Sequence, residues 1–85
     1  MIEKKVTVLL KHGLQARAGS KFVEKASAFN SDINIIKNGR LVVGKSIMGV
    51  MTLAVRQGEE IYLTADGTDE QNAIVALETF LLNKE

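Results

Sequence analysis

The sequence predicts an α+β fold in which a four-stranded antiparallel sheet is covered on one face by three helices. Segments of alternating hydrophobicity and segments of helical periodicity follow one another in the order β-α-β-β-α-β-α. Asn38-Gly39 separates two of the strand segments, and this dipeptide is the strongest short signal for a hairpin because both residues tolerate a positive φ. The connections around the hairpin are too short to form independent units, so we expect a single domain over residues 1–85.

The first strand and the first helix are predicted on either side of His12-Gly13. Residues 2–10 alternate in hydrophobicity, which indicates a strand with one buried face. Residues 16–29 carry apolar side chains at helical spacing, which indicates an amphipathic helix of about four turns. The apolar side chains of this helix are Phe22, Val23, Ala26 and Phe29.

The middle of the chain is predicted to hold the hairpin and a second helix. Strands over residues 33–37 and Arg40–Val43 flank the Asn-Gly turn, and Gly44 ends the second strand. Ser46 directly precedes the apolar segment 47–55, which is the position of a helix N-cap.

The last strand and the last helix are predicted after a Gln57-Gly58 turn. Residues 60–65 alternate and indicate the fourth strand. Thr68 and Gln71 have the spacing of a capping box, which marks the start of a helix. The apolar face of this helix is expected to comprise Ala73, Ile74, Leu77, Phe80 and Leu81.

The composition is that of an ordinary soluble globular protein, with 46% hydrophobic and 25% charged residues. No stretch is long and apolar enough to span a bilayer, and residues 1–5 lack the apolar core of a signal peptide, so we expect a cytoplasmic protein. The absence of Cys excludes disulfides, thiolate catalysis and sulfur-ligated metals. The net charge of +1 gives no general attraction to nucleic acid or membranes. Motif spacing assembles no carboxylate pair, triad or metal cluster, so we expect neither an enzyme nor a bound cofactor or metal.

Ser46 is the first candidate functional residue. As an N-cap, its side-chain oxygen would accept a hydrogen bond from an amide of the following turn and stabilise the helix by roughly 1 kcal/mol. This purely structural role is the alternative to a functional one. A phosphate on Ser46 would meet the positive end of the helix dipole, and Lys45 could pair with its charge.

The helix that Ser46 caps is expected to expose two methionines. At 100° per residue, Val50, Leu53 and Ala54 fall together and can face the core. Met48 and Met51 fall outside that group, so both should be partly exposed and could dock on a partner. The alternative is that they cover the seam between two helices.

The segment Gly13-Leu14-Gln15-Ala16-Arg17 is the second candidate. Gln15 would lie at the N-terminus of the first helix, where backbone amides bind anions, but its amide cannot act as a nucleophile. Arg17 could bind a phosphate or carboxylate, or be an ordinary exposed charge. His12 is the only His and has no second His or Cys for a metal site.

The whole chain resembles the HPr phosphocarriers of the bacterial sugar phosphotransferase system. The resemblance rests on Gly-Leu-x-Ala-Arg at the first helix, the Asn-Gly hairpin, Lys-Ser-Ile-Met-Gly-Val-Met over residues 45–51, and an acidic-capped terminal helix. The family carries a phosphoryl-accepting His where this chain has Gln15. That substitution is typical of its Crh branch, the catabolite-repression HPr-like proteins. The family fold is an open-faced β-sandwich of four antiparallel strands and three helices, in agreement with the elements above.

The resemblance implies a regulatory protein of carbon catabolite repression rather than a phosphoenolpyruvate-dependent phosphocarrier. Ser46 matches the serine that HPr kinase/phosphorylase phosphorylates. The phosphorylated form would then act as corepressor of catabolite control protein A, a LacI-type transcription factor. The positions expected to contact these partners are Arg17, Lys45, Ile47, Met48, Met51 and Gln15. The net charge of +1 predicts no direct binding of nucleic acid or membranes. We expect a monomer or a weak homodimer, since the long first strand followed by Gly13 would allow swapping between protomers.

Three residues depart from the family pattern. Ala18 stands where a proline usually follows the Arg, and Ser20 and Lys21 are more polar than the Crh pattern. Two other classes of function remain open. One is a phosphotransferase-system phosphocarrier that uses another acceptor, such as His12. The other is a carrier of a prosthetic group on Ser46, although such carriers place an acidic residue before the serine.

Overall fold

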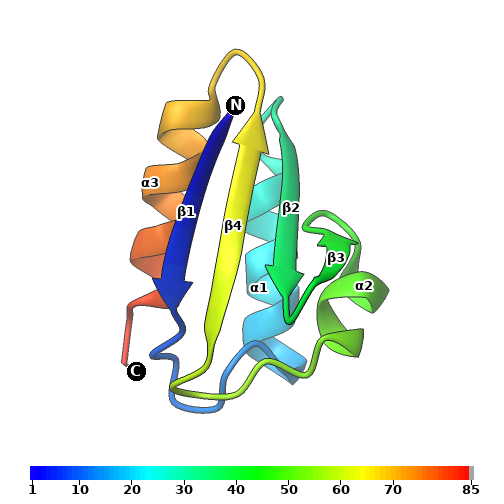
Figure 1. Cartoon of the computed structure of the whole chain (residues 1–85), viewed down its shortest axis with the longest axis vertical. Coiled ribbons are helices and arrows are strands. Elements are labelled where there is room, and N and C mark those ends of the chain that lie inside the picture. The colour runs from blue at the N-terminus through cyan, green and yellow to red at the C-terminus, as the bar shows by residue number, and fades with distance from the viewer. Residues whose placement is uncertain (85) are drawn as a thin grey trace.

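Four strands form one antiparallel sheet in the order β1-β4-β2-β3, and three helices lie between or after them in the chain (Figure 1). The computed structural model describes residues 1–84. The elements are β1 (Ile2–Thr7), α1 (Ala16–Ser27), β2 (Asp32–Lys37), β3 (Arg40–Val43), α2 (Ile47–Thr52), β4 (Glu60–Asp66) and α3 (Glu70–Leu81). The predicted order of elements is confirmed, and β3 has the predicted bounds.

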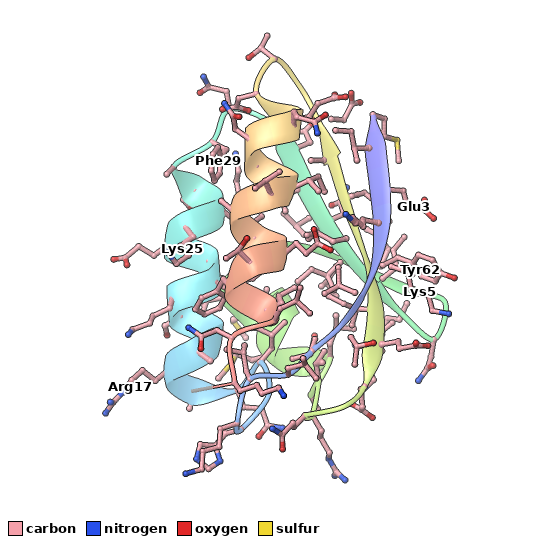
Figure 2. The ribbon with its side chains drawn as sticks, turned by 90° about the vertical axis from the view of Figure 1, so that its left-hand side faces the viewer. Glu3, Lys5, Arg17, Lys25, Phe29 and Tyr62 are labelled. Carbon is pink, nitrogen blue, oxygen red and sulfur yellow. The ribbon has the colours of Figure 1, made fainter. Side chains whose placement is uncertain are left out.

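The helices lie on one side of the sheet and leave the other side uncovered. α1 and α3 lie behind the sheet in Figure 1, while α2 lies beside β3. α1 contacts both of the other helices. Figure 2 shows Glu3, Lys5 and Tyr62 on the side of the sheet that faces away from the helices. The fold is therefore the predicted open-faced sandwich.

The hydrophobic core lies between the sheet and the helices. β1, β2 and β4 contribute the side chains of their inner faces, and each helix contributes the side chains of its apolar face. Burying one such aliphatic or aromatic side chain stabilises a fold by about 1.5–3 kcal/mol. The buried side chains of the strands are Val6, Ile33, Ile35, Ile61, Leu63 and Ala65, and those of the helices are Phe22, Ala26, Val50, Ala73, Ile74, Leu77 and Leu81.

β1 is shorter than the predicted strand over residues 2–10, because its ladder with β4 ends at Thr7. The following backbone turns to other partners. The Val8 N–H donates to the Glu59 carbonyl at 2.9 Å, and the Leu9 N–H donates to the Leu81 carbonyl at 2.8 Å. The apolar residues Val8 and Leu10 beyond Thr7 remain buried. The alternating pattern therefore predicted their burial correctly but overestimated the length of the strand.

α2 is also shorter than predicted, since it ends at Thr52 and not at residue 55. Ala54 has φ +49°, a left-handed conformation that cannot continue the helix, and it is exposed where a core position was expected. The end of the helix is held from the hairpin. The Lys37 ammonium donates to the carbonyls of Leu53 and Ala54 at 3.0 and 3.3 Å and to a Glu59 carboxylate oxygen at 2.9 Å.

The predicted capping box at Thr68 is wrong, because Asp69 occupies the N-cap position of α3. The Asp69 side chain caps nothing in its own helix. Its carboxylate accepts hydrogen bonds from the Asn30 and Ser31 amides at 2.9 and 3.1 Å and from the Ser31 hydroxyl at 2.6 Å. Asp69 therefore ties the turn between α1 and β2 to the start of α3. The hydroxyl bond from Ser31, followed by the Asn30 amide, lowers the pKa of Asp69 from its ordinary value of 3.8.

Candidate functional site

Ser46 occupies the N-cap position of α2. Its backbone is extended, with φ −104° and ψ 115°. Its hydroxyl oxygen accepts a hydrogen bond from the Gly49 N–H at 3.2 Å, which satisfies one amide of the first turn. The predicted N-cap is confirmed, and the residue is half-buried rather than enclosed in the core.

Three apolar side chains of α2 are exposed beside Ser46. Ile47, Met48 and Met51 are 46%, 74% and 39% exposed, and together we call them the apolar patch. Val50 is fully buried and anchors the helix to the core. The predicted partial exposure of the two methionines is therefore confirmed. Exposed, flexible thioether side chains suit contact with a partner surface.

One edge of the apolar patch lies over α1. A Cβ added at Gly19 would come within 2.8 Å of the Met51 sulfur. Met51 therefore packs against α1 at a position that has no side chain, and in this respect it does cover a helix–helix seam. Met48, with three-quarters of its surface exposed, does not.

Lys45 makes a contact that the sequence did not predict. Its ammonium donates to the Phe29 carbonyl at 2.7 Å, just beyond the C-terminal end of α1. This bond joins the loop before α2 to the end of α1. One of its three donors is therefore already engaged, and this bond holds the ammonium at the end of α1.

Gln15 occupies the N-cap position of α1. Its backbone carbonyl accepts hydrogen bonds from the Ala18 and Gly19 amides at 3.1 and 3.4 Å, while its side chain makes no capping bond. The next residue, Ala16, has φ +48°, a left-handed conformation that strains a residue with a Cβ. Gln15, Ala16 and Arg17 are all exposed. The chain therefore presents the start of α1 to solvent.

Gln15, Arg17 and His12 line one shallow depression of about 510 Å³ at this end of α1. Figure 2 shows Arg17 extending outward from the start of α1. The other residues that line the depression are Leu10, Lys11, Ala16, Ala18, Lys21, Phe80 and Asn83. Ser46 and the apolar patch do not line it. The structure thus divides the predicted site residues into two neighbouring sets, joined by the contact between α1 and α2.

Sequence reasoning did not single out Lys11, Lys21 or Phe80 as members of a site. The spacing of Arg17 and Lys21 is a signal that was present, because residues four apart share one face of a helix. Phe80 lies near the other end of the chain, and only the packing of α3 against α1 brings it to the depression.

Within residues 1–84, no group of three or more His, Cys, Asp or Glu side chains is placed to hold a metal ion. The helices of the same range are also too short or too polar for any of them to cross a membrane.

The chain is similar to known proteins over almost its full length. The HPr-like protein Crh of Halalkalibacterium halodurans is 51% identical over 81 residues, which cover 95% of this chain and 96% of that protein. The crystal structure of HPr-C-His from Thermoanaerobacter tengcongensis has a TM-score of 0.95 at 43% identity and covers 99% of this chain and 94% of that one.

A crystal structure of Crh from Bacillus subtilis, described as a dimer with a swapping domain, has a TM-score of 0.77 at 48% identity. It covers 95% of this chain and 93% of that one. The relatives are phosphocarrier or HPr-like proteins and not enzymes. A family model for the phosphorylation site of the HPr component of the phosphotransferase system matches residues 2–83. The chain therefore belongs to the HPr family.

Proposed function

We propose that this protein is a regulatory HPr-like protein of carbon catabolite repression. In this proposal HPr kinase/phosphorylase phosphorylates Ser46, and the product is a corepressor of catabolite control protein A. All 85 residues act as one HPr-like domain in the cytoplasm, without direct contact with nucleic acid or membranes. The protein is a monomer or a weak homodimer.

The observation that carries the proposal is the position of Ser46 at the border of the apolar patch. The half-buried hydroxyl makes one hydrogen bond, to the Gly49 amide, and has apolar side chains exposed beside it. A phosphate there would add about −1.5 to −2 charges at the border of the apolar patch. Such a change would alter partner choice without altering the core, because Val50 and the rest of the inner face stay buried.

Arg17 and Gln15 supply the other half of the proposed contact. Arg17 is exposed and has a guanidinium that could bind a partner carboxylate in a bidentate arrangement. Gln15 occupies the exposed start of α1, where an acceptor His would have to lie. Its amide nitrogen is not a nucleophile, so phosphoenolpyruvate-dependent transfer through this position is not expected. Lys45 would serve the contact by holding the loop before α2 against α1.

A phosphocarrier function through His12 is the second candidate. The supporting observation is that His12 is exposed and lines the same depression as Gln15 and Arg17. An imidazole on that loop would be reachable by a phosphoryl donor that docks at α1.

Mass spectrometry after incubation with each phosphoryl donor separates the two candidates. We expect kinase with ATP to add one phosphate to the wild-type protein and none to Ser46→Ala. Thr52→Ala is the matched control, because Thr52 is an exposed hydroxyl residue at the end of the same helix. It should be phosphorylated like the wild type. Enzyme I with phosphoenolpyruvate should add nothing. An acid-labile phosphate from that donor, lost in His12→Ala, would favour the second candidate instead.

The corepressor step needs a binding measurement. In a calorimetric titration, the Ser46-phosphorylated protein should bind the transcription factor, and the unmodified protein should show no binding. Equal binding of both forms would contradict the proposed switch while leaving phosphorylation intact.

A further inference from the structure

The three methionines are the side chains of this protein that a peroxide oxidises most readily. The chain contains no Cys and no Trp, so no thiol or indole competes for the oxidant. The thioether sulfur attacks one oxygen of the peroxide, and the O–O bond breaks. The proton of the transferred oxygen passes to the departing hydroxide, which leaves as water. The sulfur is oxidised, the peroxide is reduced, and the product is methionine sulfoxide.

The three methionines differ in how well an oxidant can reach them. Met1 and Met48 are both 74% exposed. Met51 is 39% exposed, and its sulfur lies over Gly19 of α1, within 2.8 Å of where a Cβ would be. Because a peroxide must reach the sulfur to react with it, Met1 and Met48 should be oxidised before Met51.

Of the two well-exposed methionines, only Met48 belongs to the apolar patch. It is the second residue of α2 and lies two residues after Ser46. Met1 precedes β1, and its amino group lies 3.2 Å from a Glu70 carboxylate oxygen at the start of α3. Figure 1 shows the N-terminus near the top of the sheet and α2 near the bottom, beside β3. Met1 is therefore a matched reference, because it is equally exposed but lies away from the patch.

We propose that Met48 is a redox-sensitive modification site, at which oxidation by peroxide turns off docking through the apolar patch. This switch rests on the proposed function, in which the patch contacts the transcription factor. The sulfoxide is a polar acceptor, and burying it against a partner surface that was complementary to a thioether leaves its oxygen without a donor. A phosphate on Ser46 would thus permit docking, and an oxygen on Met48 would prevent it.

Oxidation of Met48 should leave the fold intact. Three-quarters of the Met48 surface is exposed, so its side chain contributes little to the packing of α2. The fully buried Val50 holds the same helix to the core, and Ser46 caps it through the Gly49 amide. The switch is also reversible, because methionine sulfoxide reductases return the sulfoxide to the thioether.

Peroxide treatment of the Ser46-phosphorylated full chain tests this site. Hydrogen peroxide is added and then removed, and mass spectrometry of peptides locates the added oxygens. We expect an oxygen on Met1 and on Met48 before any on Met51. Calorimetric titration with untreated transcription factor should then show binding about tenfold weaker than before oxidation. Treatment with methionine sulfoxide reductases for both epimers should restore the binding, while circular dichroism shows an unchanged fold.

Met48→Leu separates oxidation of Met48 from oxidation elsewhere in the chain. Leu keeps an apolar side chain at this position but has no sulfur, and the equally exposed Met1 remains. The phosphorylated variant is compared with itself before and after peroxide, whatever its own affinity. Peroxide should weaken its binding less than about twofold.

The possible failures of this experiment are distinguishable. Equal loss of binding in Met48→Leu, oxidation of Met51 ahead of Met48, or no loss in the wild type would each overturn the switch at Met48 and leave the proposed function intact. If the phosphorylated protein does not bind before oxidation, the proposed function is wrong, and the switch that rests on it is refuted as well.

Discussion

Replacing Gly19 with Ala is expected to stabilise the fold and to move Met51. Gly19 lies inside α1, where Ala is more favourable than Gly by about 1 kcal/mol. The new Cβ would approach the Met51 sulfur at 2.8 Å, while the Leu14 carbonyl oxygen at 3.5 Å is an ordinary contact. Met51 is 39% exposed, so its thioether can turn outward. Moving the Met51 side chain costs about 0.5 kcal/mol, at the low end for a strained rotamer. The free energy of unfolding should therefore rise by about 0.5 kcal/mol.

Thermal unfolding followed by circular dichroism measures this effect. A gain of that size should raise the Tm of a chain of this length by about 2–4 °C. Gly39→Ala is the contrasting control, because a Cβ there meets nothing within 4 Å but φ is +80°. It should destabilise by about 1–2 kcal/mol through backbone strain alone. A Tm of Gly19→Ala as low as that of Gly39→Ala would refute the argument that the Met51 side chain yields.

Three further predictions concern other positions. Ala54→Gly should raise the free energy of unfolding in urea by about 0.5–1 kcal/mol, because the left-handed φ of +49° strains Ala and not Gly. Asp69→Asn should lower stability at neutral pH. Because the pKa of Asp69 is lowered by folding, its carboxylate stabilises the fold above pH 3.8 and loses this effect as pH falls through the lower folded value. Urea midpoints measured from neutral pH down through this region should therefore fall less steeply for the variant, and parallel curves would contradict this account. Met48→Asp should change the free energy of unfolding by less than about 0.5 kcal/mol, since Met48 is 74% exposed. It should weaken calorimetric binding of the phosphorylated protein to the transcription factor about tenfold, and unchanged binding would remove Met48 from the contact.

Local patterns predicted much of the fold because the determining interactions are close in sequence. The Asn38-Gly39 turn sets the β2–β3 hairpin, and its register pairs Lys37 with Arg40 directly beside that turn. Ser46 caps α2 through an amide three residues away. Helical periodicity likewise placed Met48 on the exposed side of α2.

The predicted helix boundaries were incorrect where the local sequence pattern does not determine the structure. Asp69 has the position of a cap, but its carboxylate is taken by Asn30 and Ser31, which are 39 and 38 residues away in sequence. Helical periodicity carried the second helix through Ala54, whose backbone turns left-handed instead. For the same reason the depression at α1 was only partly predictable, since Phe80 is brought there by tertiary packing.

The Lys37 ammonium has a consequence for the position of α2. The Lys37 side chain is 15% exposed, and its ammonium joins the β2–β3 hairpin to the carbonyls of Leu53 and Ala54 just after α2. The same ammonium also donates a hydrogen bond to the carboxylate of Glu59, in the loop before β4. The end of α2 is thus held by a residue of β2 that is not among those we expect to meet a partner. Loss of the Lys37 ammonium would therefore be expected to disturb the apolar patch on α2 without removing any residue of that patch.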